Sequence, residues 1–254
     1  MIKLLEKRGA FMGKIFAATS GKGGVGKSTV SVGLALAFSK QNLKVLLVDM
    51  DEGLACLDLM LGIEEPCLFN LSDILMGKEI SEAVYTTENH PNIDLISSPE
   101  DTGMIDAFAF TNFANKVKEL YDIVIFDFPA GIDFSLYTCL PKETLFLTVA
   151  FPDPVTVRDA SIVSRKLYEI GFNARLIINS FQYKLTQKRL FKNIDQIIDE
   201  SALRLLGIVP KSEELSLLSI KHKLKARGNV MKAFIRISKR LNGENILLPH
   251  PKKI

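Results

Sequence analysis

The residues with the clearest chemical meaning form a glycine-rich stretch near the start of the chain. Gly21-Lys22-Gly23-Gly24-Val25-Gly26-Lys27-Ser28-Thr29 fits the pattern GxxxxGK[ST]. Its glycines let backbone N–H groups wrap a phosphate chain, Lys27 would reach the terminal phosphates, and the Ser28 hydroxyl would bind Mg²⁺. An apolar run precedes the stretch and a helix-like run follows it, which favours a phosphate-binding loop over an unliganded glycine turn.

Three aspartates follow apolar runs and are candidates for binding a ligand or a cation beside that loop. Asp49 and Asp51 form a D-x-D after Val45–Val48, and Asp127 follows Ile123–Phe126. Open α/β sheets bind ligands at the carboxyl ends of their strands. A carboxylate after four apolar residues is costly unless it meets a cation, and Mg²⁺ is a natural partner. The alternatives are an exposed turn for Asp51 and a structural role for Asp127.

The elements that must position these residues alternate between apolar runs and helix-like segments. The apolar runs are continuous, as expected for parallel strands covered on both faces: they span 15–19, 45–49, 93–96, 123–128, 145–150, 176–178 and 206–209. Helical spacing occupies the segments between, for example residues 157–170. We therefore predict a doubly wound, mostly parallel α/β sheet flanked by helices on both faces.

Composition restricts the class of protein further. The chain has 254 residues, 47% of them hydrophobic and 24% charged, which suits one sizeable globular domain. Its three cysteines stand far apart, as reduced cytosolic thiols do. No apolar run approaches the roughly 18–20 residues that span a bilayer. We expect a cytoplasmic protein that can lie peripherally at the inner face of the cell membrane.

The charge is unevenly distributed along the chain. Residues 201–254 hold 12 Lys and Arg against 3 Asp and Glu, although the net charge of the whole chain is only +3. A basic quarter of this kind attracts nucleic acid or an anionic membrane, or is simply a solvated surface.

Lys22 adds a second cation inside the loop, which is redundant in a monomer but useful across an interface. The form KGGVGKST resembles the deviant Walker A loop of the MinD/ParA ATPase family. The resemblance covers residues 13–241 and is closer to the MinD branch, which positions cell-division machinery. It implies ATP and Mg²⁺ as cofactors, an ATP-dependent homodimer, slow hydrolysis and an activator protein. Lys22 would then cross to the partner's nucleotide and steady its phosphate charge.

The resemblance also assigns roles to further residues. Asp51 matches the aspartate that orients the attacking water, and Asp49 lies near the Mg²⁺ hydration shell. Asp51 is therefore a candidate magnesium ligand together with Ser28, Asp49 and Asp127. Phe128-Pro129-Ala130-Gly131-Ile132 resembles the second switch, in which Gly131 donates an N–H to the γ-phosphate. Asn179 occupies the base-recognition position and Pro210 a second loop beside the base.

The two ends of the chain depart from the family or extend beyond it. Residues 1–12 are interpreted as a leader outside the domain, with Met12 as an alternative start and a membrane- or partner-binding turn as the alternative role. Val230, Phe234, Ile237 and Leu241 share one helical face, for which we favour core packing over membrane insertion. The tail, residues 242–254, is short and interrupted by proline, without a recognisable family anchor.

Other functions stay open at this point. In the first switch, Ala55 and Cys56 replace an Arg-Asn pair of many MinD proteins, which weakens any transfer of the family's partner-binding surface. A ParA-type ATPase that binds DNA nonspecifically is the first alternative, because of the basic quarter. A flagellar-number regulator of related architecture is a second, and a non-catalytic scaffold or metal-cofactor insertase a third.

Overall fold

The computed structural model describes residues 13–131, 134–183 and 194–250. Eight strands form one sheet in the order β3-β4-β2-β5-β1-β6-β7-β8. All neighbouring strands are parallel except β3, which runs antiparallel to β4. The strands are β1 (Lys14–Thr19), β2 (Val45–Asp49), β3 (Tyr85–Thr86), β4 (Ile93–Ile96), β5 (Ile123–Asp127), β6 (Leu145–Ala150), β7 (Asn173–Phe181) and β8 (Leu205–Pro210). The predicted doubly wound α/β fold is confirmed.

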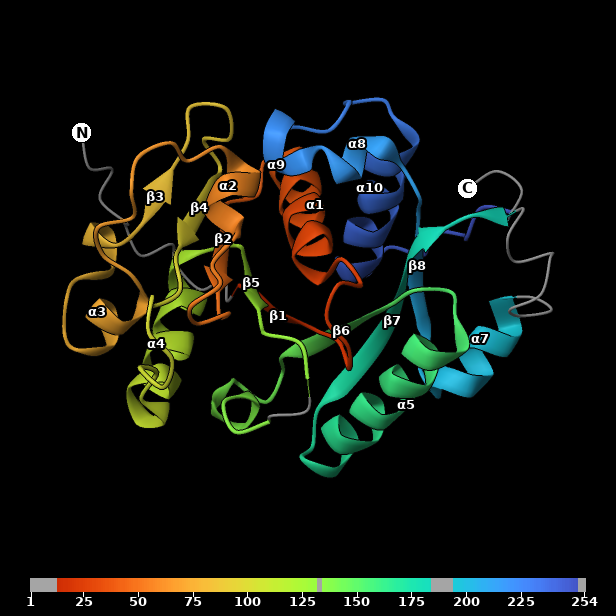
Figure 1. Cartoon of the computed structure of the whole chain (residues 1–254), viewed down its shortest axis with the longest axis horizontal. Coiled ribbons are helices and arrows are strands. Elements are labelled where there is room, and N and C mark those ends of the chain that lie inside the picture. The colour runs from red at the N-terminus through yellow and green to blue at the C-terminus, as the bar shows by residue number, and fades with distance from the viewer. Residues whose placement is uncertain (1–12, 132–133, 184–193, 251–254) are drawn as a thin grey trace.

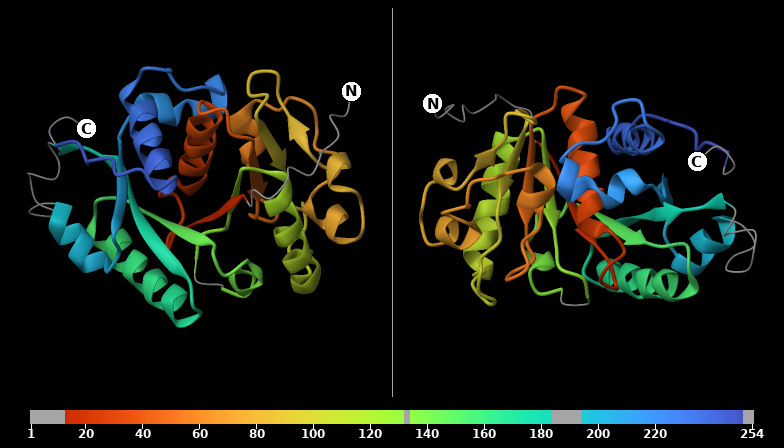
Figure 2. Two further views of the ribbon diagram at one scale, coloured as in Figure 1. Left: turned by 180° about the vertical axis from the view of Figure 1, so that it is seen from behind. Right: turned by 45° about the horizontal axis from the view of Figure 1, so that its top comes forward.

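Helices cover both faces of this sheet (Figures 1 and 2). One face is covered by α1 (Lys27–Ser39), α2 (Leu57–Leu61), α8 (Glu213–Ser216), α9 (Leu218–Lys221) and α10 (Asn229–Leu241). The other is covered by α3 (Leu71–Leu75), α4 (Ala107–Leu120), α5 (Pro154–Glu169) and α7 (Ile194–Ser201). Two short 3-10 helices, η1 (Ile80–Glu82) and η2 (Tyr137–Cys139), lie in connections.

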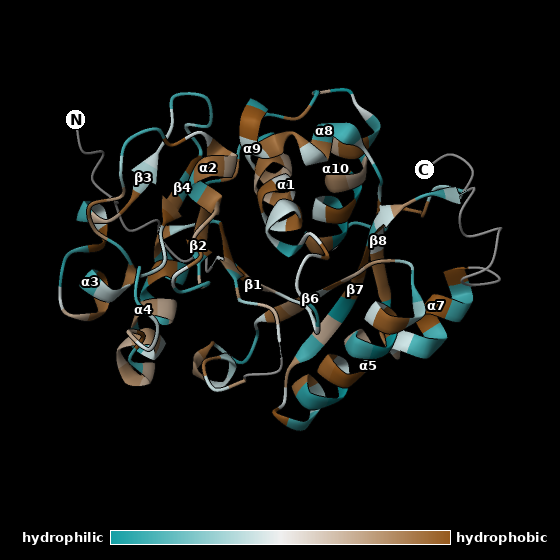
Figure 3. Ribbon diagram, viewed as in Figure 1, coloured by the Kyte–Doolittle hydropathy of each residue, from teal (hydrophilic) through white to brown (hydrophobic). Residues whose placement is uncertain are grey.

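The strands are apolar because both of their faces are covered. In β2 and β5 every residue is buried, including the terminal aspartates. By contrast, α5 and α7 are apolar on one side and polar on the other (Figure 3). Parallel strands with helices on both faces bring all their carboxyl ends to one edge of the sheet, so β1, β2 and β5 deliver the predicted site residues together.

Helix α10 packs into the core, as expected from its sequence. Its predicted apolar residues are buried, with Phe234 0% and Leu241 8% exposed. Two glycines allow this close packing: a Cβ atom at Gly33 would lie 2.3 Å from the Phe234 ring, and one at Gly207 would lie 2.3 Å from Ile237. The apolar face of α10 is therefore occupied by the protein's own core. Within the described residues, no helix is both long and apolar enough to span a bilayer.

Several details differ from the sequence expectations. Strand β7 extends beyond the predicted 176–178, strand β5 stops at Asp127 rather than residue 128, and the two-residue strand β3 was not predicted. Helix α5 begins at Pro154, where the Asp153 carboxylate caps the amides of Val155 and Thr156. The predicted leader, residues 1–12, and the last four residues of the predicted tail lie outside the described residues.

Candidate functional site: a phosphate-binding loop with three aspartates

The glycine-rich loop connects β1 to α1 at the carboxyl edge of the sheet. Gly24 and Gly26 have φ values of 78° and 82°, a conformation that glycine adopts without the steric cost of a Cβ atom. Gly26 is the N-cap of α1, and no side chain caps that helix end. The free amides and the positive end of the helix dipole therefore point toward the loop, as a phosphate-binding site requires.

Lys27 and Asp127 form a buried ion pair behind the loop. The Lys27 Nζ lies 3.4 Å from the Asp127 Oδ2 atom, and both residues are buried. Ser31, one turn further along α1, donates a hydrogen bond of 2.8 Å to the other oxygen of Asp127. Sequence reasoning did not single out Ser31, although its spacing of four residues from Lys27 places both on one side of the helix.

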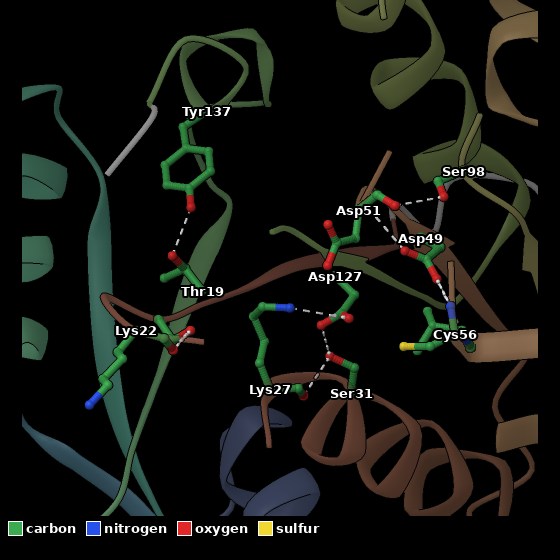
Figure 4. A network of polar contacts seen from close by, with 12 residues as sticks. Thr19, Lys22, Lys27, Ser31, Asp49, Asp51, Cys56, Ser98, Asp127 and Tyr137 are labelled. Atoms are coloured by element: carbon green, nitrogen blue, oxygen red, sulfur yellow. Dashed lines mark hydrogen bonds and ion pairs between the residues drawn. The ribbon is translucent and has the colours of Figure 1, made fainter. Parts of the chain in front are cut away.

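The two lysines of the loop have opposite environments. Lys27 is 7% exposed and directed inward, whereas Lys22 is exposed. Figure 4 shows the Lys22 side chain extending away from Lys27 and Asp127. The Lys22 carbonyl accepts a hydrogen bond of 3.0 Å from the Ser20 hydroxyl, which fixes the backbone while the ammonium group stays free to reach outward.

Asp49 holds the first switch in place through the backbone. One of its oxygens accepts the N–H of Asp51 at 3.1 Å, and the other accepts the N–H groups of Cys56 and Leu57 at 3.1 and 3.3 Å. Burial, followed by repulsion from Asp127, raises the pKa of Asp49 to about 6. Because backbone amides occupy both oxygens, the direct contact of Asp49 is with the switch, and its place in the magnesium shell stays a prediction.

Asp51 is the carboxylate that faces the loop. Its side chain is directed toward Asp127 and the Lys27 ammonium (Figure 4). Burial raises the pKa of Asp51, Lys27 opposes that rise, and Asp127 adds to it. The Ser98 hydroxyl donates to the Asp51 carbonyl at 3.0 Å, so the loop after β4 supports this residue. Its position suits a group that orients a water near the terminal phosphate.

The donor groups around Ser28 fit a divalent cation bound with nucleotide phosphates. Asp49 and Asp127 lie side by side in the register of β2 and β5, and Asp51 is close enough to interact with both Lys27 and Asp127. Three carboxylates beside one buried lysine leave negative charge that Mg²⁺ would balance. Ser28 is partly exposed. Within the described residues, no group of three acidic, histidine or cysteine side chains is arranged so that it could hold a metal ion by itself.

The second switch is docked on the start of the loop. The Gly131 N–H, predicted to contact a γ-phosphate, donates to the Ser20 carbonyl at 3.0 Å. Tyr137, which sequence reasoning missed, forms a hydrogen bond of 2.7 Å with the Thr19 hydroxyl. Both contacts join the segment after β5 to the last residues before the glycines. A γ-phosphate would have to compete with the Ser20 carbonyl for the Gly131 amide.

Asn179 and Pro210 lie at the carboxyl ends of β7 and β8. The Asn179 Nδ2 group donates to the Val25 carbonyl at 2.8 Å, so this side chain supports the glycine-rich loop directly. A Cβ atom at Gly26 would lie 2.3 Å from the same Nδ2 atom. The Asn179 Oδ1 atom is buried without a partner, which leaves it able to accept a hydrogen bond from a ligand. Pro210 is buried and pairs in register with Phe181.

This combination of fold and site defines a P-loop nucleotide-binding protein of the doubly wound class. Residues 16–225 match the family described as the CobQ/CobB/MinD/ParA nucleotide binding domain, and the chain belongs to that family. It is 31% identical to the septum site-determining protein MinD of Synechocystis, over 92% of this chain and 91% of that protein. The identity to MinD of Bacillus subtilis is also 31%, covering 93% of this chain and 92% of the relative.

Solved structures agree with this assignment. MinD in the MinC:MinD cell division complex of Aquifex aeolicus superposes with a TM-score of 0.84 at 26% identity, covering 93% of this chain and 99% of that one. MinD of Pyrococcus horikoshii, solved with Mg-ADP, has the same fold, with a TM-score of 0.79 at 24% identity, over 91% and 96% of the two chains. The predicted resemblance to the MinD/ParA family is confirmed.

Proposed function

We propose that this chain is an ATP-dependent dimerising ATPase of the MinD type, which positions cell-division machinery and hydrolyses ATP slowly until a partner protein stimulates it. The observation that carries the proposal is the contrast between the two lysines of the loop. Lys27 is buried against Asp127, whereas Lys22 is exposed and directed away from it. A second loop lysine that does not serve its own site is suited to a nucleotide held by a second copy.

The described residues supply the groups that hydrolysis needs. Loop amides and Lys27 hold the phosphates, Asp51 orients the attacking water, and Lys22 of the partner subunit neutralises charge in the transition state. Ser28 and Asp127 would hold magnesium, which would neutralise phosphate charge and align the terminal phosphate. Positioning and electrostatics dominate phosphoryl transfer, so a site completed only on dimerisation is slow in the monomer.

Two further residues fit roles on the nucleotide. The Asn179 Oδ1 atom has no partner and would accept a hydrogen bond from the exocyclic amine of adenine. The Nδ2 group of the same side chain would keep its hydrogen bond to the Val25 carbonyl. Pro210 would line the same end of the site. In this arrangement one side chain contacts both base and loop, so a base lacking an amine at that position would bind more weakly.

If the chain works as a MinD-type ATPase, its dimer acts on a membrane. If it works as a ParA-type partition ATPase, its dimer acts on DNA. The 12 cations in residues 201–254 favour an anionic surface of either kind. Sedimentation with anionic liposomes, in the presence of competing duplex DNA, separates the two. Capture by liposomes with ATP and not with ADP supports the MinD reading, whereas ATP-dependent, salt-sensitive retention on DNA replaces it with the ParA-type reading.

Analytical ultracentrifugation and ATP turnover test the switch itself. We expect a dimer with ATP and a monomer with ADP. The Lys22→Ala variant should still bind ATP, but it should not dimerise and its turnover should fall at least tenfold. The Lys27→Ala variant should lose nucleotide binding. Lys40→Ala, a lysine exposed just after α1, is the matched control and should behave as wild type. Equal dimerisation of wild type with ATP and ADP would contradict the proposal.

A further inference from the structure

Asp127 is the most deeply buried carboxylate of the site, with 0% of its surface exposed. An ionised carboxylate in such surroundings is stable only when cations or hydrogen-bond donors compensate for the lost water. Figure 4 shows the side chains of Lys27 and Ser31, from the first two turns of α1, directed at it. Among the residues that the structure describes, these two side chains are the donors to the Asp127 carboxylate, one to each oxygen.

One of these two donors is needed elsewhere when a nucleotide binds. The Lys27 Nζ atom lies 3.4 Å from Asp127 Oδ2, and Lys27 is also the residue assigned to the terminal phosphates. A nucleotide therefore competes with Asp127 for the Lys27 ammonium group. The Ser31 hydroxyl is short, fully buried and one helical turn behind the loop, so it stays with Asp127 when Lys27 turns to the phosphates.

The hydrogen-bond distances single out Asp127 as the acceptor for Ser31. The Ser31 Oγ atom lies 2.8 Å from Asp127 Oδ1 and 3.2 Å from the Lys27 carbonyl oxygen. A serine within a helix often donates only to the carbonyl four residues earlier, and this is the purely structural interpretation of Ser31. The hydroxyl has one proton, and hydrogen bonds to an ionised acceptor are the shorter and stronger ones. The proton of Ser31 therefore points to the carboxylate.

We propose that Ser31 is a positioning residue of the nucleotide site, an inference that rests on the function proposed above. Ser31 holds Asp127 Oδ1, so that Oδ2 stays available to magnesium after Lys27 has moved to the phosphates. The neighbouring strand adds to this need, because Asp49 pairs in register with Asp127 and its charge repels that carboxylate. Without the hydroxyl, Asp127 would have no side-chain donor left once Lys27 moved away.

This role predicts a specific defect in the Ser31→Ala variant. Without magnesium, Asp127 can keep the Lys27 ammonium group as a neighbour, so nucleotide affinity should stay within about threefold of wild type. With magnesium, the variant lacks the hydrogen bond that orients the carboxylate, and a hydrogen bond to a charged group is worth about tenfold or more in an equilibrium constant. The gain in affinity that magnesium gives should therefore fall about tenfold.

Titrations with N-methylanthraniloyl-ADP measure this gain without any hydrolysis. The fluorescent nucleotide is titrated into each protein with EDTA, and again at increasing Mg²⁺ concentrations. We expect magnesium to tighten binding to wild type, and Ser31→Ala to lose most of this tightening and to need a higher Mg²⁺ concentration for half of it. Ser31→Thr retains a hydroxyl and should keep the gain within about threefold of wild type. Far-UV circular dichroism shows that each variant is folded.

Ser238→Ala is the matched control, because it also removes a fully buried serine hydroxyl from a helix on the same face of the sheet. The Ser238 hydroxyl donates to the Ile235 carbonyl at 3.0 Å and accepts from the Gln41 Nε2 group at 2.7 Å. Its loss should lower the melting temperature but leave the magnesium gain unchanged. Equal loss of the gain in both alanine variants would indicate a general loosening of the helices and would overturn the role of Ser31.

Two further outcomes decide between this inference and the function on which it rests. A wild-type magnesium gain in Ser31→Ala would overturn the positioning role and leave the proposed ATPase function standing. An equal loss of affinity with and without magnesium would also overturn it, because Ser31 would then support the loop and not Asp127. A wild-type protein that binds no N-methylanthraniloyl-ADP under any condition would instead contradict the proposed function, and the role of Ser31 with it.

Discussion

The two ends of this sheet differ in charge and in how they use their apolar side chains. Residues 45–115 form an acidic lobe, with fourteen Asp and Glu but one lysine and no arginine, and this lobe exposes Met104 and Phe108 beside the first switch. At the other end, α10 carries cations on its outer side but buries the apolar face that includes Phe234. Apolar residues at the acidic end are therefore open to solvent, whereas the basic end is suited to attract an anionic surface by charge.

The largest expected effect is a difference in stability between variants of two phenylalanines, one at each end of the sheet. Phe234→Ala should lower the free energy of unfolding by about 3–4 kcal/mol, because it leaves a cavity between α10 and α1. Phe108→Ala should change it by less than about 0.5 kcal/mol, because the ring is 79% exposed. Urea unfolding followed by circular dichroism measures both. Similar losses for the two variants would mean that the two ends of the sheet do not differ as described.

The sequence could predict those features that are determined by residues close together in the chain. The continuous apolar runs predicted the buried strands, and the loop motif with its flanking elements placed Lys27, Asp49 and Asp127 at one edge. Strand β3 is only two residues long and carries no period that would reveal it. Its antiparallel pairing with β4 depends on tertiary packing.

The contacts that hold the site together were beyond sequence reasoning for a different reason. Tyr137 and Thr19 are 118 residues apart, and nothing in either segment indicates their hydrogen bond. The Gly131 N–H donates to the Ser20 carbonyl, and backbone N–H groups donate to both Asp49 oxygens. These hydrogen bonds likewise depend on loop conformations. Motifs identified the groups, whereas only the structure shows which of their atoms are already engaged.

The next largest effect concerns how Asp49, at the acidic end, makes the stability of the protein depend on pH. Burial and Asp127 raise the pKa of Asp49 to about 6. Between pH 4 and 6 the native state therefore binds more protons than the unfolded chain, so this residue's contribution to stability decreases as the pH rises. We expect wild type to lose roughly 2–3 kcal/mol of unfolding free energy relative to Asp49→Asn between pH 4 and 7. Urea unfolding of both proteins at the two pH values measures this difference.

Nucleotide provides the control for that measurement. If the excess negative charge beside Lys27 is what opposes ionisation of Asp49, saturating MgATP should reduce the pH-dependent difference between the two proteins. A difference that is the same with and without MgATP would place the cause in burial alone. It would also weaken the assignment of magnesium to this group of carboxylates.

The smallest expected effect concerns the basic end. Arg204 directly precedes β8, Arg227 lies just before α10, and Lys232 lies on α10; all three are exposed. Replacing all three with glutamate should weaken ATP-dependent binding to anionic vesicles or duplex DNA about tenfold. On DNA, the slope of log K against log salt should become shallower by about 0.9 for each lost phosphate contact. Basal ATP turnover should stay unchanged, because these side chains lie outside the nucleotide site.

A matched variant decides whether position or net charge matters. Lys116, Lys142 and Arg165 are also exposed but lie on other parts of the fold, so their replacement with glutamate changes the net charge by the same amount. Exposed charges more than about 10 Å apart are largely screened at 0.1 M salt, so a contact surface at the basic end predicts little effect of this variant. Equal weakening by both triple variants would show that the surface responds to overall charge, and the two ends of the sheet would then differ only in how they use their apolar side chains.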